Sequence, residues 1–402
     1  MNILVLAHFQ NDISPSCIFV HAQAKAYKRL GHTVTEISPV GWVPFLSFLR
    51  PGRKQFQKKA VGMQVHDGIP IYYPRYLSLG DFVSQKWNGY NLYRAAKKIV
   101  RRLLKTQKID VIHAHMLDRD GYAAALLKKK FHIPVVITSH GSDLIRYFDG
   151  QPEPYLLQTC YQADKIVLVS EKLRKVLSRY FPVENTEVIY NGIENYPVSG
   201  ITRNPYGILS VGTLISRKKF DVTISAFAKV KQKFPMAELT IAGQGEELEY
   251  LQNLALECGV ADSVHFVGYI ENREIFRFFA SNQMFVLPSV GEGFGIVYVE
   301  AMNAGCIPFG TVGEGIDGTI RDGENGYLVS PDDAEGLAGR MIQLLEMKPD
   351  QIEALRSSAK ETARGYTWEN NAVRYLEIFQ RLMLGEKNAK DESMHFTVDE
   401  KR

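Results

Sequence analysis

The sequence has few cysteines, and it has no long apolar run. Its four cysteines are scattered over 402 residues without a CxxC pair, which argues against a disulfide framework or a zinc site and fits a reducing cytoplasm. No uninterrupted apolar stretch reaches the roughly 20 residues that a membrane span requires. The amino terminus, MNILVLAHFQ, lacks the basic segment and the apolar core of a signal peptide. These absences predict a cytoplasmic protein whose first residues form a buried strand.

The composition is that of an ordinary globular protein. Hydrophobic residues make up 45% of the chain and charged residues 23%, values that argue against long disordered regions. A chain of this length is too long for one compact core, so we expect two domains of ordinary size. The formal net charge is only +4, but the basic residues cluster in the first half of the chain.

Short β-rich runs alternate with helical patterns along almost the whole chain, which is typical of parallel α/β sheets. Strands are expected at 110–115, 134–140 and 283–289, for example, and helices at 88–107 and 295–304. We therefore predict an α/β protein with two tandem, doubly wound, Rossmann-like domains. The expected parts are a first domain at 1–193, a linker at 194–206, a second domain at 207–366, a last helix at 367–385 and a disordered tail at 386–402.

The segment GEGFGIVYVEAM, residues 291–302, places Glu292 in a glycine-rich turn and Glu300 in an apolar helix. A glycine loop that leads from a strand into a helix start is a ready site for an anion such as phosphate. A buried carboxylate is costly unless it is paired, and two vicinal ribose hydroxyls would pair with Glu300. The alternative is a turn glutamate and a surface helix glutamate without a ligand.

Three cations, Arg217, Lys218 and Lys219, stand where another helix is expected to begin. Cations oppose the dipole of a helix start unless an anion binds there. A solvated basic turn would explain them equally well in isolation. Together with the glycine loop in the same domain, they favour a diphosphate ligand.

The first domain offers weaker candidates at the carboxyl ends of its expected strands. His140, in TSHGSD, ends a buried strand and is either structural or part of a ligand site. His113 and His115 alternate on one strand, and we interpret them as core or pocket lining. Asp118-Arg119-Asp120 resembles a metal-binding DxD motif, but helix capping is the favoured interpretation.

These motifs resemble those of a known enzyme family, the retaining glycosyltransferases of the GT-B fold, family 4 type. The resemblance rests on EGFGIVYVEAM, GTLISRKKFD and GEGIDGTIRDGENGYLVSP in the second half, and on TSHGSD and VIYNGI in the first. Residues 14–39 are most similar to bacterial members that build cell-surface polysaccharides such as teichuronic acid or exopolysaccharide. The resemblance implies transfer of a sugar, with retention, from a nucleoside-diphosphate sugar to a glycan or a lipid-linked acceptor.

The resemblance also assigns roles to residues. Glu292 and His140 would be catalytic, with Glu292 at the donor sugar and His140 near its reacting face. The donor-binding residues would be Glu300 for the ribose, Arg217 and Lys218 for the diphosphate, Gly268 and Ile270 beside the base, and the backbone of Phe294, Gly295 and Ile296 for the sugar and distal phosphate. A UDP-sugar is the expected donor, no metal or cofactor is expected, and the last helix would return to the first domain.

Two positions depart from the family pattern. Thr213 stands where the family often has an arginine, and Ser16-Cys17 stands where it often has a Gly-Gly phosphate loop. These departures keep open a catalytically degenerate, sugar-nucleotide-binding subunit. A UDP-sugar 2-epimerase of the same fold is a further alternative, although such enzymes need additional acid/base carboxylates.

Basic and aromatic residues of the first domain predict contact with an anionic membrane surface. The residues expected there are Trp42, Phe45, Arg50, Arg53, Lys54, Lys97, Arg101 and Arg102. The alternative is a solvated helix beside a loop packed on the core. Nucleic acid is not an expected partner, because no known binding module appears. A lipid-linked acceptor at the inner face of the membrane would explain the pattern.

Overall fold

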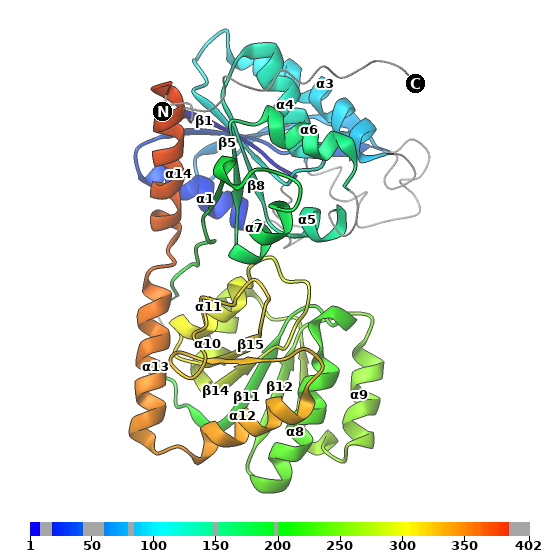
Figure 1. Ribbon diagram of the computed structural model, residues 1–402, viewed down its shortest axis with the longest axis vertical. Coiled ribbons are helices and arrows are strands. Elements are labelled where there is room, and N and C mark those ends of the chain that lie inside the picture. The colour runs from blue at the N-terminus through cyan, green and yellow to red at the C-terminus, as the bar shows by residue number, and fades with distance from the viewer. Residues whose placement is uncertain (9–17, 43–59, 79–83, 148–151, 197–199, 386–402) are drawn as a thin grey trace.

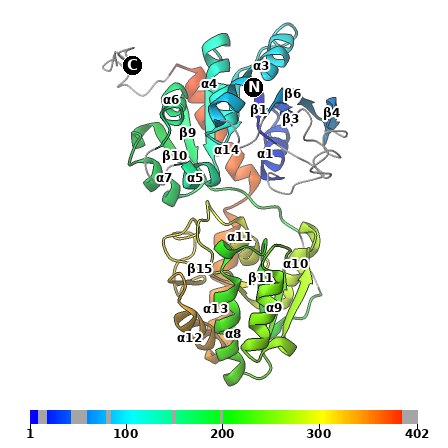
Figure 2. The same cartoon turned by 90° about the vertical axis from the view of Figure 1, so that its right-hand side faces the viewer.

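The computed structural model describes residues 1–8, 18–42, 60–78, 84–147, 152–196 and 200–385. Figures 1 and 2 show two halves, one above the other, each built around a twisted sheet with helices packed against it. Two long helices, α13 (Pro349–Arg364) and α14 (Trp368–Met383), run along one side of both halves. The expected disordered tail, residues 386–402, lies outside the described residues.

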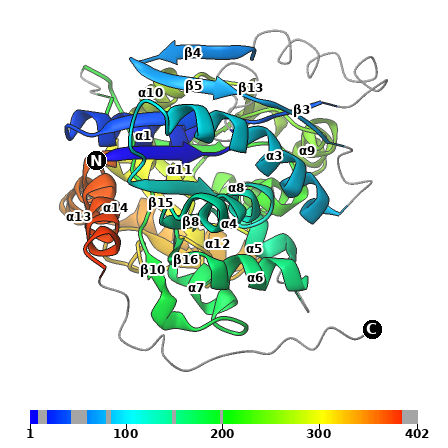
Figure 3. The same cartoon turned by 90° about the horizontal axis from the view of Figure 1, so that it is seen from above.

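The first half contains a sheet whose described strands follow the order β10-β9-β8-β7-β1-β2-β5-β4. All neighbours are parallel except β4 and β5, which lie at one edge of the molecule in Figure 3. The strands are β1 (Asn2–Leu6), β2 (Thr33–Ile37), β4 (Gly62–His66), β5 (Ile69–Tyr73), β7 (Val111–His115), β8 (Val135–Ser139), β9 (Lys165–Leu168) and β10 (Thr186–Val188). The helices are α1 (Ile18–Arg29), α3 (Gln85–Leu103), α4 (Arg119–Phe131), α5 (Ser142–Tyr147), α6 (Pro154–Gln162) and α7 (Glu171–Leu177). A separate pair, β3 (Val40–Trp42) and β6 (Arg75–Leu77), lies beside α3.

The second half contains a sheet of described strands in the order β13-β12-β11-β14-β15-β16, with every pair parallel. The strands are β11 (Asn204–Val211), β12 (Glu238–Ala242), β13 (Val264–Gly268), β14 (Asn282–Val286), β15 (Ile307–Thr311) and β16 (Tyr327–Val329). The helices around them are α8 (Phe220–Lys233), α9 (Leu248–Glu257), α10 (Asn272–Ser281), α11 (Ile296–Asn303) and α12 (Ala334–Glu346). The predicted α/β fold with two doubly wound sheets is confirmed.

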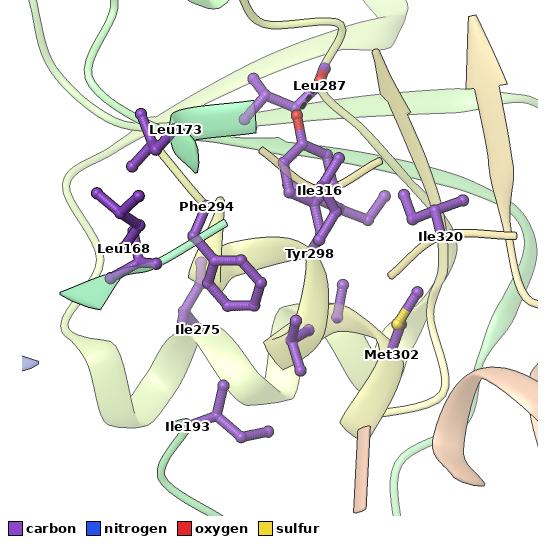
Figure 4. Close-up of a cluster of buried hydrophobic side chains, with 14 of the residues drawn as sticks. Leu168, Leu173, Ile193, Ile275, Leu287, Phe294, Tyr298, Met302, Ile316 and Ile320 are labelled. Atoms are coloured by element: carbon purple, nitrogen blue, oxygen red, sulfur yellow. Dashed lines mark hydrogen bonds between the residues drawn. The ribbon is translucent and has the colours of Figure 1, made fainter. Parts of the chain in front are cut away.

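The central strands form where apolar residues run without interruption. Every residue of β7 and β8 is buried, as expected of parallel strands with helices on both faces. An apolar cluster continues from these strands into the second half, where Phe294 lies beside Leu168 and Leu173 of the first half (Figure 4). The two halves therefore share apolar contacts at their junction.

Helix α14 packs against α1 and the first sheet, although these elements lie far apart in the sequence. Its buried face includes Trp368, Tyr375 and Phe379. The Tyr375 hydroxyl lies 2.9 Å from the Thr138 hydroxyl on β8, and the Asn371 side chain donates to the Tyr190 carbonyl over 2.7 Å. These contacts join the end of the described chain to its first half.

The structure differs from expectation between residues 40 and 77 and at the linker. Strands β3 to β6 were not among the expected elements, and β11 begins at Asn204, inside the segment expected to be linker. Prolines at 70 and 74 argue against strands, but Pro70 lies within β5 beside the edge strand β4. Strand β5 lies between β2 and β4, but its pairing with β2 involves Ile71 and Tyr72, so Pro70 lies outside that parallel ladder and its missing N–H costs little there.

Candidate functional site

The loop between β14 and α11 takes its shape from glycines. Gly291 and Gly295 have φ angles of 71° and 90°, in the left-handed region that favours glycine. A Cβ at Gly295 would lie 2.6 Å from the Tyr298 ring. Tyr298 in turn donates to the Leu287 carbonyl over 2.5 Å. The loop is thus held against the end of β14, with α11 beginning directly after Gly295.

Glu292 lies in this loop and forms ion pairs with the two cations of the facing loop. Its carboxylate contacts the Lys218 ammonium, and the Arg217 guanidinium lies 3.5 Å away. Burial acts to raise the pKa of Glu292, but the two cations outweigh it and hold the pKa below its usual value. The Val290 N–H donates to the Arg217 carbonyl over 2.8 Å. The structure thus brings together three of the predicted site residues, with Glu292 ionised.

Lys219, the third cation of the motif, points elsewhere. Its ammonium lies 2.6 Å from the Asp332 carboxylate, and this hydrogen bond raises the pKa of Lys219. Arg217 is therefore the cation beside Lys218 that faces Glu292.

Glu300 lies on α11, which is apolar on most sides and packs against α10 and α13. No hydrogen bond or ion pair to its side chain is found among the described residues. Burial raises the pKa of this carboxyl to about 7. A partly buried acid without a protein partner is what a ligand with hydroxyl donors would complement.

The glycine loop meets the first half of the molecule at His140 and Gly141. A Cβ at Gly293 would lie 2.0 Å from the His140 carbonyl oxygen, and a Cβ at Gly141 would lie 2.6 Å from the Gly293 Cα. Two backbone segments, one from each half, are therefore in direct contact. This contact places His140 next to the loop that carries Glu292.

His140 stacks on His115, and the Nε2 of His140 lies 2.9 Å from the Nδ1 of His115. Burial lowers the pKa of His140 well below its usual value, so the ring is neutral at pH 7. His140 Nδ1 and His115 Nε2 have no partner among the described atoms. One N–H lies between the two neutral rings, so one of the two outer ring nitrogens is a donor and the other is an acceptor. A polar ligand could bind to both.

The remaining donor-site predictions lie at the same edge of the second sheet. Gly268 ends β13 with a φ angle of 72°, and Ile270 follows it. The Phe294 ring is buried between Tyr190 and Tyr366, so only its backbone is available to a ligand. Ile296 begins α11, directly after Gly295.

The predicted capping role of the Asp118-Arg119-Asp120 motif is wrong. Asp118 occupies the N-cap of α4 with φ and ψ of −69° and −96°, and its side chain makes no cap hydrogen bond, since capping needs an extended backbone there. Asp120 instead accepts from His8 Nδ1 over 2.8 Å. His8 Nε2 lies 2.7 Å from the Tyr76 hydroxyl.

His8 was not among the predicted site residues, although its position in the sequence is a signal for it. It lies two residues after β1, whose carboxyl end lies at the same sheet edge as those of β7 and β8. His113 bonds to Thr138 and Tyr27 within the core, so its interpretation as core lining is correct. The side-chain partners of His8 come from α4 and β6, which sequence order does not place together.

Several predicted contact residues lie outside the described residues. These are Ser16 and Cys17 of the phosphate loop, and Phe45, Arg50, Arg53 and Lys54 of the membrane set. Of the others, Trp42 is 44% exposed at the end of β3. Arg101 and Arg102 are exposed near the end of α3, with the half-buried Lys97 one turn earlier.

Comparisons with known proteins agree with this architecture. The chain is 26% identical over 339 residues to the N-acetyl-alpha-D-glucosaminyl L-malate synthase of Bacillus anthracis, a match that covers 80% of this chain and 87% of that protein. The sucrose-phosphate synthase of Thermosynechococcus elongatus superposes with a TM-score of 0.77 at 19% identity, covering 96% of this chain and all of that one. The Anabaena protein HepE, solved in complex with UDP, superposes with a TM-score of 0.72 at 18% identity, covering 94% of this chain and all of HepE.

The structural likenesses show the fold, which is the GT-B arrangement of two Rossmann-like domains. Two family models then account for nearly all of the described chain. Residues 18–195 match the family described as Glycosyltransferase Family 4, and residues 193–365 match Glycosyl transferases group 1. The chain therefore belongs to the glycosyltransferases, with a family 4 first half and a group 1 second half.

Proposed function

We propose that this glycosyltransferase moves a sugar, with retention of anomeric configuration, from a nucleoside-diphosphate sugar to an acceptor hydroxyl. The observation that carries the proposal is the pairing of Glu292 with Lys218 and Arg217. Glu300, on the helix that follows the same loop, has no partner among the described residues and supports it. The two cations match the charge of a diphosphate. The two carboxylates match the hydroxyls of the donor sugar and of the ribose. Uridine is the proposed base, which the UDP bound to HepE supports.

In this proposal the second half binds the donor. Lys218 and Arg217 neutralise the diphosphate, and the N-terminus of α11 adds its unpaired N–H groups. Glu300 accepts hydrogen bonds from the two ribose hydroxyls. The backbone near Gly268 and Ile270 lies beside the base. Once the diphosphate binds the cations, Glu292 is released to contact the donor sugar.

The proposed reaction breaks the bond between the anomeric carbon and the distal phosphate oxygen. The acceptor oxygen attacks from the face that the diphosphate leaves, and the acceptor proton passes to the departing phosphate. Lys218 and Arg217 stabilise the negative charge that develops on the diphosphate. His140, neutral and next to the glycine loop, orients the sugar through its free ring nitrogen, so the reaction as proposed uses no metal or other cofactor.

A donor panel tests this proposal. The protein is mixed with UDP-, GDP- and ADP-sugars, and thermal shift and release of nucleoside diphosphate are both measured. We expect one UDP-sugar to give release, with the product anomer matching that of the donor by proton NMR. Donors that stabilise the protein without any release would instead favour the catalytically degenerate binding subunit. An inverted product would contradict the retaining mechanism.

We further propose a glycan or lipid-linked acceptor at an anionic membrane surface. Arg101 and Arg102 on α3 are exposed, and Trp87 and Tyr90 are 36% and 48% exposed on the same helix. Basic residues near such a surface contribute about 1 kcal/mol each. No helix in the described part of the chain has the length and apolar character that spanning a membrane requires. A peripheral position at the inner face, and a role in bacterial surface polysaccharide synthesis, complete the proposal.

Vesicle co-sedimentation tests the membrane contact. The protein should bind phosphatidylglycerol vesicles more strongly than phosphatidylcholine vesicles, and Arg101→Glu/Arg102→Glu should lose most of that preference. The matched control is Lys229→Glu/Lys233→Glu, which makes the same change in net charge on α8, at the far end of the second half. Equal binding of the two vesicle types by the wild-type protein would remove this part of the proposal.

A further inference from the structure

Glu314, in the loop after β15, joins the two halves of the molecule. Its Oε2 accepts from the Glu292 backbone N–H over 2.8 Å. The same oxygen lies 2.5 Å from the Lys172 ammonium, which belongs to α7 of the first half. One carboxylate therefore contacts both the donor-site loop and the opposite half.

The three side chains around this contact are shielded from water. Glu314 and Glu292 are each 12% exposed, and Lys172 is 20% exposed. Charge pairs in such surroundings are screened less than surface pairs. The loop that carries Glu314 is itself fixed, because a Cβ at Gly315 would lie 2.3 Å from the Gly293 carbonyl oxygen.

These contacts form one continuous series across the junction between the two halves. It runs from Lys172 to the Glu314 carboxylate, from there to the Glu292 N–H, and through the Glu292 side chain to Lys218. Every member except Lys172 belongs to the second half. This series of contacts is complete only when the two halves lie as close together as they do in this structure.

We propose that Glu314 and Lys172 are positioning residues that couple the approach of the two halves to the orientation of Glu292. The inference rests on the proposed role of Glu292 at the donor sugar. When the halves separate, Glu314 loses Lys172, and the Glu292 N–H loses its fixed acceptor. When they approach, the ion pair re-forms and sets the backbone that directs the Glu292 side chain.

This coupling predicts a separation of turnover from nucleotide binding. The proposed UDP contacts, Lys218 and Glu300, lie entirely in the second half. Lys172→Met should therefore lower kcat on the order of tenfold and leave the Kd of UDP within about twofold. Glu314→Gln keeps an acceptor for the Glu292 N–H and should have a similar effect, whereas Glu314→Ala loses both contacts and should be worse.

A double-mutant cycle with a matched control completes the kinetic test. Lys172→Met/Glu314→Gln should be no slower than either single variant, because both changes remove one ion pair. Lys229→Met, which removes an exposed pair with Glu335 inside the second half, should leave kcat unchanged. Additive losses, an unchanged kcat in Lys172→Met, or a Kd of UDP weakened as much as kcat would each overturn the proposal.

A measurement that does not depend on turnover tests this inference separately from the proposed reaction. Small-angle X-ray scattering should show the UDP-bound wild-type protein as more compact than UDP-bound Lys172→Met, with the Lys229→Met control like the wild type. This difference is expected even if no donor in the panel is turned over. Identical scattering curves for the two UDP-bound proteins would contradict the coupling whatever the reaction proves to be.

Discussion

At the scale of single residues, the site balances its charges before any ligand is present. Glu292 holds Lys218 and Arg217 together, where two unpaired cations would repel each other. In the proposed function, the diphosphate of the donor takes the place of this carboxylate. Glu300 is the opposite case, because it is partly buried, has no hydrogen-bond or ion-pair partner in the part of the chain that the structure describes, and has a pKa that burial raises to about 7. The carboxylate of Glu292 is thus paired with protein cations, whereas the proposed partner of Glu300 is the ribose of the donor.

The raised pKa of Glu300 should make the stability of the folded protein depend on pH. Its carboxyl has a pKa of 4.5 when unfolded and about 7 when folded, so the folded state prefers the protonated form. Stability from this group is fully present below pH 4.5 and is lost as pH rises through 7. Glu300→Gln should therefore stabilise the protein at pH 8 by on the order of 2 kcal/mol and have little effect at pH 4, as measured by urea unfolding.

The same substitution should weaken nucleotide binding. An ionised carboxylate accepts hydrogen bonds from both ribose hydroxyls, so UDP affinity in the wild type should rise as pH increases through about 7. Glu300→Gln should lower UDP affinity and flatten this pH profile. The control is Glu377→Gln on the exposed face of α14, which should alter neither quantity. A Glu300→Gln protein with wild-type affinity at pH 8 would rule out the ribose contact.

At the scale of elements, the two halves meet through glycines. The Cβ positions at Gly141 and Gly293 are filled by backbone of the opposite half, so no other residue allows this approach. Gly293→Ala should push the loops apart and lower turnover by more than about tenfold, since small displacements of catalytic groups are costly. Circular dichroism should show intact secondary structure in this variant.

A glycine in open surroundings provides the control for that variant. Gly339 lies inside α12 with no atom within 4 Å of its Cβ position. Gly339→Ala should keep full turnover and gain roughly 0.5–1 kcal/mol from helix propensity. Equal turnover of Gly293→Ala and Gly339→Ala would show that contact between the loops is not needed for the reaction.

Elements with strong local patterns could be predicted from the sequence. The apolar run at 110–115 predicts β7, which spans Val111–His115, and the pattern at 295–304 predicts α11, which spans Ile296–Asn303. The short strands β3 and β6 have three residues each, and among the described strands they pair with one another alone. A stretch of that length carries too little periodicity to be distinguished from a loop.

At the scale of the whole molecule, the site depends on contacts that no local pattern encodes. Glycine spacing and isolated charges pointed to Glu292, Glu300 and Lys218, because these residues lie within strand–loop–helix units. Lys172 and Glu314 are 142 residues apart, and His8 and Asp120 are 112 apart. Their pairing follows from how two sheets pack and how their edges align, so sequence reasoning could not find it.

The central claim is that Glu292 serves the donor sugar while Lys218 and Arg217 serve the diphosphate. The most direct measurement compares wild type and Glu292→Gln for UDP affinity by calorimetry and for UDP release from the donor found in the panel. Removing the competing carboxylate should leave UDP affinity equal or tighter, while release falls by at least about a hundredfold. Weaker UDP binding together with unchanged release would contradict the account.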